Sequence, residues 1–201
     1  VCSSDLMIQE QALSSWKLLT GMPIKIVVTG DDMGVSELCS KLQVIHEPEV
    51  RRSHGIPQIR HMLELGYKHG TDKDVFVWTN SDMIYTQDVI QTVKALLSRR
   101  DQFFLLGQRW DWKERRKIDL ENFNFEAIRK ECRLHSPCGV DYIIHAKGVL
   151  LKDLPKETLI GTPGFDGMLV HTALRTNLLT VDCTNTITAV HQNHEIGRAH
   201  V

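Results

Sequence analysis

The sequence predicts an α/β fold with a mixed, mainly parallel sheet flanked by helices. Short runs rich in β-branched and aromatic residues alternate along the chain with stretches of helical periodicity, a pattern typical of α/β domains. The clearest strand run, residues 74–79 (DVFVWT), is followed by the clearest amphipathic pattern, residues 89–97. The 201 residues are enough for one domain with a substantial core.

The first half of the chain supplies most of the regular pattern. Pro57 suits the first position of a helix, because its fixed φ and missing N–H are tolerated there. Gly70 suits the residue that ends that helix. The other elements expected in this half are a helix at 9–19, a strand at 24–29 (IKIVVT), a short helix at 35–42 and a short strand at 43–46.

The second half is less regular. Residues 109–117 are polar and charged and contain two tryptophans. Irregular loops on a rigid scaffold often carry specificity, which makes this half the expected acceptor side. The elements expected here are strands at 102–107, 140–145, 178–182 and 186–191 and helices at 121–132 and 163–176.

Composition excludes several classes of protein. The chain is 42% hydrophobic and 24% charged with a formal net charge of −1, so its charge favours neither nucleic acid nor an anionic membrane surface. No apolar stretch approaches the roughly 20 residues that span a bilayer. The five cysteines are odd in number and form no CxxC pair, so neither a zinc ribbon nor a disulfide framework is indicated. A cytoplasmic location is expected.

Both ends of the chain resemble translated sequencing-adapter sequence. Residues 1–6 (VCSSDL) and 196–201 (IGRAHV) carry this resemblance and are expected to be non-native tails. The expected organisation is therefore a single domain over residues 7–195, truncated at its N-terminal side.

The tip after residues 74–79 is the most informative candidate site. Asn80, Ser81 and Asp82 follow this strand directly, and ligands of open α/β sheets bind beyond the carboxyl ends of strands. Asp82 could ligate a divalent cation, with substrate phosphates and water completing its shell. Asn80 could add its carbonyl oxygen or contact a ribose. The alternative is that these residues only make a turn.

Two further candidates follow strand runs. Asp31 and Asp32 lie after residues 24–29, where a carboxylate can accept hydrogen bonds from a ribose or a base; the alternative is a solvated turn with a helix cap. Arg109 and Trp110 follow residues 102–107. Arg109 could clamp a phosphate and Trp110 could stack on a sugar or base; the alternative is a salt-bridged loop with a packed indole.

The last candidates are histidines and a carboxylate. His191 and His194 come after an apolar strand run, so we expect only one of them to approach Asp82; imidazole suits Mn²⁺ better than Mg²⁺. The alternative is a polar surface turn. Asp166 lies just inside a helix start that opens with Pro163. It could be a general base, kept ionised by a pKa lowered by nearby backbone donors, or only a carboxylate that stabilises the helix.

Seven short motifs, in order, resemble the nucleotide-diphospho-sugar transferase superfamily, the glycosyltransferases of the GT-A fold. The nearest resemblance is to a family-two-like branch, and it covers essentially residues 12–194. The motifs are ALSSW (12–16), IKIVVTGDD (24–32), FVWTNSDMI (76–84), FLLGQRWD (104–111), GVDYIIHAKGV (139–149), IGTPGFDGML (160–169) and HQNH (191–194).

The resemblance implies a Rossmann-like GT-A domain and a role for each match. Residues 80–82 stand where such enzymes carry a DxD metal motif, with Asn replacing its first Asp. Asp31 and Asp32 match the nucleoside-contacting region, and Asp166 matches an acidic residue near the acceptor. His191 or His194 matches a histidine that completes the metal shell. The first nucleotide-binding strand, expected before Ala12, would be missing or truncated.

The function implied is metal-dependent transfer of a sugar from a nucleotide-diphosphate donor to a glycan, lipid or small-molecule acceptor. The expected cofactor is Mn²⁺ or Mg²⁺, and nucleic acid is not an expected partner. Two alternatives stay open. One is a nucleotide-sugar-binding protein of the same fold without catalysis, which the Asn at position 80 favours. The other is a nucleotidyltransferase, although the sequence shows no glycine-rich basic phosphate loop.

Overall fold

The computed structural model describes residues 3–100, 102–114, 116–137, 139–146, 153–175 and 178–193, and its architecture is α/β as predicted. None of the helices in these ranges is long and apolar enough to cross a membrane. The helices are α1 (Ser3–Leu18), α2 (Val35–Leu42), α3 (Ile59–Lys68), α4 (Asp88–Leu97), α5 (Phe125–Ile128), which continues into a 3₁₀ turn η1 (Arg129–Glu131), and α6 (Phe165–Arg175).

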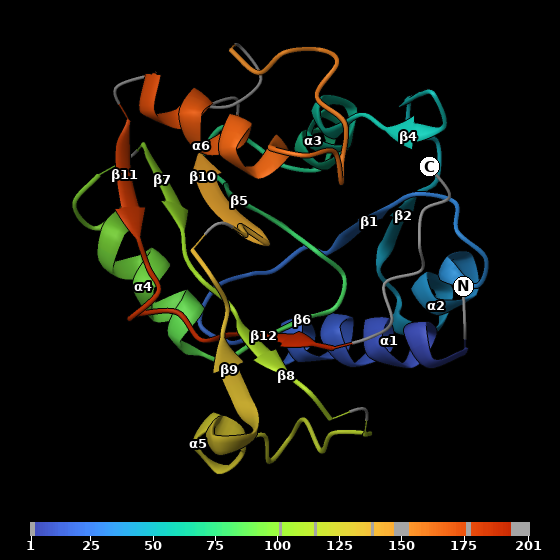
Figure 1. Cartoon of the computed structure of the whole chain (residues 1–201), viewed down its shortest axis with the longest axis vertical. Coiled ribbons are helices and arrows are strands. Elements are labelled where there is room, and N and C mark those ends of the chain that lie inside the picture. The colour runs from blue at the N-terminus through green and yellow to red at the C-terminus, as the bar shows by residue number, and fades with distance from the viewer. Residues whose placement is uncertain are drawn as a thin grey trace.

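The strands form two larger and two smaller sheets (Figure 1). The larger sheets have the orders β11-β7-β10-β5 and β6-β12-β8-β9, and the smaller ones are β1-β2 and β3-β4. The strands are β1 (Val27–Thr29), β2 (Ile45–Glu47), β3 (Arg52–Ser53), β4 (Ile56–Pro57), β5 (Val75–Thr79), β6 (Met83–Tyr85), β7 (Phe103–Leu106), β8 (Trp110–Trp112), β9 (Cys132–Leu134), β10 (Tyr142–Ala146), β11 (Leu179–Asp182) and β12 (Ala189–Gln192).

The prediction of a mixed sheet is confirmed, but the prediction that it is mainly parallel is wrong. Within the described ranges, β1–β2, β7–β11 and β8–β12 pair in parallel, whereas the other five strand pairings are antiparallel. The reason lies in the chain path between β7 and β10. That segment returns to the end of the sheet where β7 finishes, since Ile143 pairs with Leu106. Strand β10 therefore runs back against both β7 and β5.

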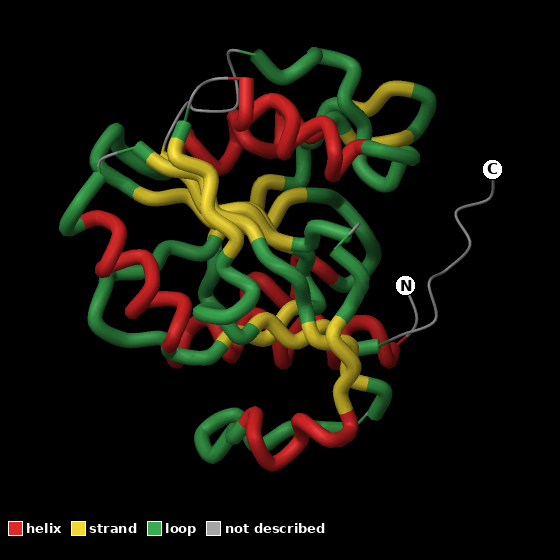
Figure 2. The backbone as a smooth tube through the Cα atoms, turned by 60° about the vertical axis from the view of Figure 1, so that its left-hand side comes forward, coloured by secondary structure: helices red, strands yellow, loops and turns green. Residues whose placement is uncertain are grey.

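Helices cover both faces of the sheet β11-β7-β10-β5. Because alternate side chains of a strand point to opposite faces, Phe103 and Leu105 pack with α4 while Phe104 packs with α3 and α6. These three side chains are fully buried. Figure 1 shows α4 on one side of this sheet and α3 and α6 on the other. In Figure 2 the ribbon β8–β9 leads away from this core to α5.

Several elements differ from the sequence expectations. Residues 109–117 contain the strand β8, and residues 83–85, for which no element was expected, form β6. The expected helix at 121–132 shrinks to α5 and η1, and its last residue begins β9. The helix expected from residue 9 begins at Ser3, inside the tail expected to be foreign. The buried contacts of these segments with distant strands, rather than their local pattern, decide their structure.

Pro57 is in a strand and not at a helix start. It pairs with Arg52 in the β3–β4 hairpin, and α3 begins only at Ile59. The two residues that connect the hairpin strands, His54 and Gly55, both have positive φ, at 50° and 79°. Two left-handed residues in succession are what a two-residue type I′ hairpin turn requires. The Ser-His-Gly sequence does not show this turn as plainly as Asn-Gly would.

Candidate functional site

The turn from Asn80 to Asp82 links β5 to β6 and is fixed at several points. The Asn80 backbone N–H donates to the Asp141 carbonyl, 3.2 Å away. The Asp82 carbonyl accepts from both the backbone N–H and the side-chain amide of Gln192, each at 3.2 Å. The tip is therefore tied to the start of β10 and to β12, which lie far from it in the sequence.

Asn80 has a partner that explains why an amide, and not a carboxylate, stands here. Its side-chain Nδ2 donates to Asp141 Oδ1 at 2.8 Å. An ionised Asp at position 80 would place a second negative charge against Asp141 and could not donate to it. The amide at position 80 thus avoids a second negative charge against the buried Asp141 carboxylate.

Asp82 lies against His191, as expected for one of the two histidines. His191 Nε2 is 3.3 Å from Asp82 Oδ2, and their side chains are only 11% and 16% exposed. The strand register produces this contact, because β12 pairs with β6 so that His191 lies opposite Met83, next to Asp82. The expected proximity is confirmed for His191, whereas His194 lies outside the described residues.

A second carboxylate, Asp111, flanks His191 on its other side. Asp111 Oδ1 is 3.5 Å from His191 Nδ1, and these two residues are register partners in the β8–β12 ladder. Asp111 also accepts hydrogen bonds from Arg109 Nε at 2.8 Å and from His135 Nδ1 at 2.7 Å. Burial alone would raise the pKa of Asp111, but these two donors outweigh it and lower the pKa below its ordinary value.

Arg109 closes the network by also forming an ion pair with Asp141. Although burial opposes its charge, the two carboxylates raise the pKa of Arg109 further, so it stays protonated. These side chains therefore form one continuous series of contacts, and the backbone of residues 80–82 joins its two ends; we call this arrangement the polar ring. Its members, in order of contact, are Asn80, Asp141, Arg109, Asp111, His191 and Asp82.

Asp166 lies beside the polar ring, in the first turn of α6. Its Oδ2 accepts from the backbone N–H of Val140 at 3.4 Å, while its Oδ1 is buried with no hydrogen-bond partner in the described ranges. The prediction that helix donors lower the pKa of Asp166 is wrong. Burial raises it, the nearby Asp141 carboxylate raises it further, and the Val140 N–H and Arg109 only partly offset this. An ionised Asp166 is thus a stronger base than an exposed aspartate.

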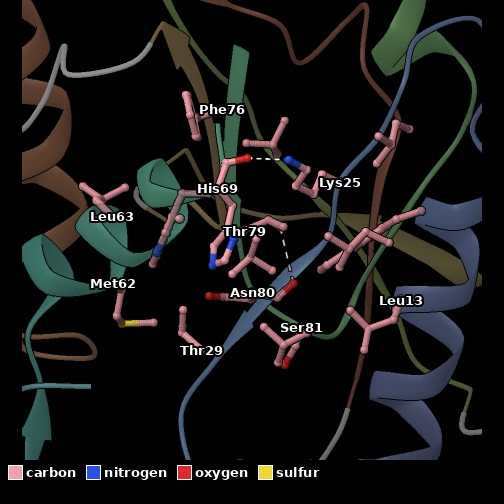
Figure 3. Close-up of a pocket in the computed structure, with 18 of the residues that line it drawn as sticks. Leu13, Lys25, Thr29, Met62, Leu63, His69, Phe76, Thr79, Asn80 and Ser81 are labelled. Carbon is pink, nitrogen blue, oxygen red and sulfur yellow. Dashed lines mark hydrogen bonds between the residues drawn. The ribbon is translucent and has the colours of Figure 1, made fainter. Parts of the chain in front are cut away.

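A cavity of about 930 Å³ adjoins the tip and runs between β1 and β5. Asp32 lines it at the end of β1, and Asn80, Ser81 and Asp82 line it at the end of β5. Figure 3 shows Asn80 and Ser81 at this edge, with Thr29 across from them. Asp31 is not among the lining residues. Its side chain is 64% exposed and is held 2.6 Å from Arg52, whose hydrogen bond lowers the pKa of Asp31.

Two expected ligand contacts have other partners in the structure. Arg109, expected to clamp a phosphate, already binds both Asp111 and Asp141. Trp110, considered for stacking on a sugar or base, packs against Phe125, with the Arg129 guanidinium 5.5 Å from its ring centroid. The packed-indole alternative therefore holds for Trp110, and Arg109 orients the carboxylates of the ring.

The donor set suits a metal only with help from a substrate. No group of three or more His, Cys, Asp or Glu side chains arranged to hold a metal occurs in the described part of the chain. One carboxylate and one imidazole, from Asp82 and His191, are the nearest approach to a site. That pair suits Mn²⁺ better than Mg²⁺, and phosphate oxygens and water would have to supply the remaining ligands.

Sequence reasoning gave no role to three residues of this site. Two of them, Asp111 and Asp141, belong to the polar ring, and the third, His135, bonds to Asp111. A signal existed for two of them. Asp111 lies between Trp110 and Trp112, an alternation that predicts a strand with its carboxylate on the opposite face. Asp141 directly precedes an apolar strand run, and a charged residue at that position is expected to lie at the end of the sheet. Nothing local distinguishes His135, which reaches Asp111 through the β8–β9 pairing.

Comparisons with known proteins give no family for this chain. No family model matches the sequence, and no curated protein matches it. The chemistry of the polar ring and the adjoining cavity is therefore the basis for a function.

Proposed function

We propose that this protein is a metal-dependent glycosyltransferase that moves a sugar from a nucleotide-diphosphate donor to an acceptor hydroxyl. The observation that supports this best is the Asp82–His191 pair, 3.3 Å apart at the carboxyl end of β5 and beside a large cavity. Ligands of open α/β sheets bind at such strand ends. The proposed cofactor is Mn²⁺ or Mg²⁺.

The donor diphosphate would bind at the tip made by Ser81 and Asp82. A divalent cation bound by Asp82 and His191 would neutralise negative charge on the leaving nucleotide. Asp32, which lines the cavity after β1, would contact the nucleoside part of the donor. Asn80, Asp141 and Arg109 would hold the tip in place rather than touch the donor.

Asp166 is the proposed general base for a reaction that inverts the anomeric centre. Its carboxylate would take the proton of the acceptor hydroxyl as the hydroxyl oxygen attacks the sugar carbon and the nucleoside diphosphate leaves. Burial beside Asp141 supports this role, because the raised pKa makes the ionised carboxylate more basic.

The test is thermal stabilisation by Mn²⁺ together with a nucleoside diphosphate, using UDP and GDP as probes. At about 100 times its dissociation constant, such a ligand should add about 2.7 kcal/mol to the free energy of unfolding. Asp82→Ala should lose the stabilisation that needs both components. Asp119→Ala is the matched control, because this exposed carboxylate accepts hydrogen bonds from the neighbouring Asn122 and lies outside the ring. An Asp82→Ala shift equal to that of the unsubstituted protein would overturn the proposed site.

A second candidate is a nucleotide-sugar-binding protein without transfer activity. The observation that favours it is the absence of a three-ligand metal group from the described residues. Incubation with radiolabelled nucleotide sugars, with and without Mn²⁺, separates the two candidates. Metal-dependent donor hydrolysis or transfer supports the enzyme, whereas binding with no turnover of any donor supports the second candidate.

A further inference from the structure

Asp111, in the middle of β8, is a ring carboxylate to which the proposed function gives no task. It is held from two sides. Arg109 Nε donates to its Oδ1 at 2.8 Å, and His135 Nδ1 donates to its Oδ2 at 2.7 Å. The backbone N–H of His135 also donates to the Arg109 carbonyl at 2.9 Å, so the two donors are themselves tied together. The direction of the Asp111 carboxylate is therefore fixed.

The strand register points this carboxylate towards the imidazole of His191. Strand β12 lies between β6 and β8 (Figure 1), and Asp111 and His191 are partners in the parallel β8–β12 ladder. Asp111 Oδ1 is 3.5 Å from His191 Nδ1, a little longer than a hydrogen bond. A carboxylate oxygen has two lone pairs, so Oδ1 can accept from Arg109 and still face this nitrogen. The two side chains are only 26% and 11% exposed, so little water competes for the contact.

The other ring nitrogen of His191 faces the candidate metal ligand Asp82. The distance from Nε2 to Asp82 Oδ2 is 3.3 Å. Two atoms that bind one cation through bonds near 2.1 Å, at the angles of tetrahedral or octahedral sites, lie about 3.0–3.4 Å apart. The spacing of these two atoms therefore fits a pair of neighbouring ligands.

His191 can act as such a ligand only if its proton is on the correct nitrogen. In a neutral imidazole one ring nitrogen carries the N–H and the other carries the lone pair. A carboxylate that accepts from the N–H nitrogen decides between them and also fixes the plane of the ring. Asp111, on the Nδ1 side, keeps the proton there and leaves the lone pair of Nε2 beside Asp82.

We propose that Asp111 is the positioning residue for His191, holding Nδ1–H so that Nε2 and Asp82 together bind the divalent cation. This inference rests on the proposed function, because the cation is the one that this function requires. Arg109 and His135 act one step further away, by fixing the Asp111 carboxylate. If Asp111 served only as a partner of Arg109, it would contribute to folding but not to the affinity for metal.

The test measures Mn²⁺ affinity of the full 201-residue chain in the presence of UDP or GDP, from the electron paramagnetic resonance signal of unbound Mn²⁺. Asp111→Asn keeps the size of the side chain but removes its charge, and should weaken Mn²⁺ binding by roughly 10–100-fold. Glu131→Gln is the matched control. This carboxylate accepts from Trp112 Nε1 and Arg116 near the same strand and lies outside the ring, so the affinity should stay nearly unchanged. Equal affinities for Asp111→Asn and the unsubstituted protein would overturn the proposal.

A double-mutant cycle separates positioning from a general effect of charge or folding. Because Asp111 acts through His191, Asp111→Asn should cause no further loss of Mn²⁺ affinity in a His191→Ala background. Losses that add would show that Asp111 attracts or binds the cation by itself, or only supports the fold. Either result would overturn the positioning role.

Nitrogen coupling in the electron spin echo of bound Mn²⁺ distinguishes failure of this inference from failure of the proposed function. A coupling that is present in the unsubstituted protein and absent in His191→Ala supports the proposal. Mn²⁺ binding that depends on Asp82 but shows no nitrogen coupling would overturn the inference and leave the proposed function in place. Absence of any nucleotide-dependent Mn²⁺ binding would overturn the proposed function, and the inference with it.

Discussion

The interior of strand β10 and the residue just before it differ completely in environment. Tyr142, Ile143, Ile144 and His145 are fully buried among apolar side chains. Asp141, one residue earlier, bonds to Asn80 and Arg109 in the polar ring. One short stretch therefore passes directly from the core to the candidate site.

We therefore expect substitutions within β10 and substitutions in the polar ring to have different effects. Core side chains stabilise the fold by packing closely and by being uncharged, so their substitution should lower the free energy of unfolding. Ring positions are already paired and partly reach solvent, so under the proposed function their substitution should change binding and turnover and should cost less stability than substitution in the core. The predictions below test that separation, in order of decreasing effect on stability.

The largest effect is expected for Phe104→Ala. Phe104 is fully buried, packs with Ile143 and stacks on His145, so the substitution should cost about 3–5 kcal/mol. Urea unfolding measures this loss. Leu174→Ala, at a side chain 59% exposed, is the control and should change stability by less than about 0.5 kcal/mol. Similar losses for the two variants would contradict the assignment of the core.

The next effect depends on pH and concerns His145. Burial lowers the pKa of His145 from 6.5 to about 4. The unfolded chain therefore binds this proton more readily than the folded chain, and the stability present above about pH 6.5 is lost as the pH falls towards 4. The loss should amount to about 3 kcal/mol. His145→Phe should flatten this part of the stability curve, measured by unfolding at pH 7 and pH 4.5. An unchanged slope would show that other groups cause the acid sensitivity.

A smaller loss is expected for Arg109→Met. This substitution leaves Asp111 and Asp141 without their shared cation, and hydrogen bonds to charged groups contribute about 1.5–3 kcal/mol. Lys41→Met is the matched control, because the Lys41–Glu10 pair is exposed and should contribute less than about 1 kcal/mol. Chemical denaturation compares the two variants. Equal losses would show that the ion pairs of Arg109 contribute no more to stability than an exposed pair.

The smallest effect on stability is expected for Asp166→Asn. Since its raised pKa means that the folded protein disfavours the ionised form, loss of the charge should leave stability unchanged within about 0.5 kcal/mol or slightly higher. Under the proposed function, transfer should fall by about 10²–10⁴. A clear loss of stability with turnover preserved would show that Asp166 only supports the start of α6.

The sequence was sufficient for elements with a strong local pattern. The helix at 35–42 has the predicted bounds, and the strand at 74–79 and the helix at 163–176 differ by one or two residues at the ends that the structure describes. Pro57 was assigned wrongly and the strand β8 was not predicted, because a hairpin turn and a distant partner strand decide their structure. Such pairings bring together residues that no short window contains.

The candidate site was predictable in part for the same reason. Asp82 and His191 stood out as polar residues at strand ends, and the alternation of side chains along a strand limited the expected contact with Asp82 to one of the two histidines. The links through Asp111 and Asp141 depend on the register of β8 and β10, which the local sequence does not show. The pKa of Asp166 was predicted in the wrong direction, because burial and the nearby Asp141 carboxylate raise it more than the Val140 N–H and Arg109 lower it.

The position of β12 has a consequence for the order of folding. This strand inserts between β6 and β8, and Gln192 also bonds to Gln11 and to the Ile8 carbonyl of α1. Contacts between residues so distant in sequence close late, because a long loop must lose its freedom first. The contact between His191 and Asp82 therefore requires that β12 has paired with β6. A ribosome-bound chain cannot form this contact until His191 has been synthesised and released from the exit tunnel, so ligand binding at this pair would report that β12 is in place.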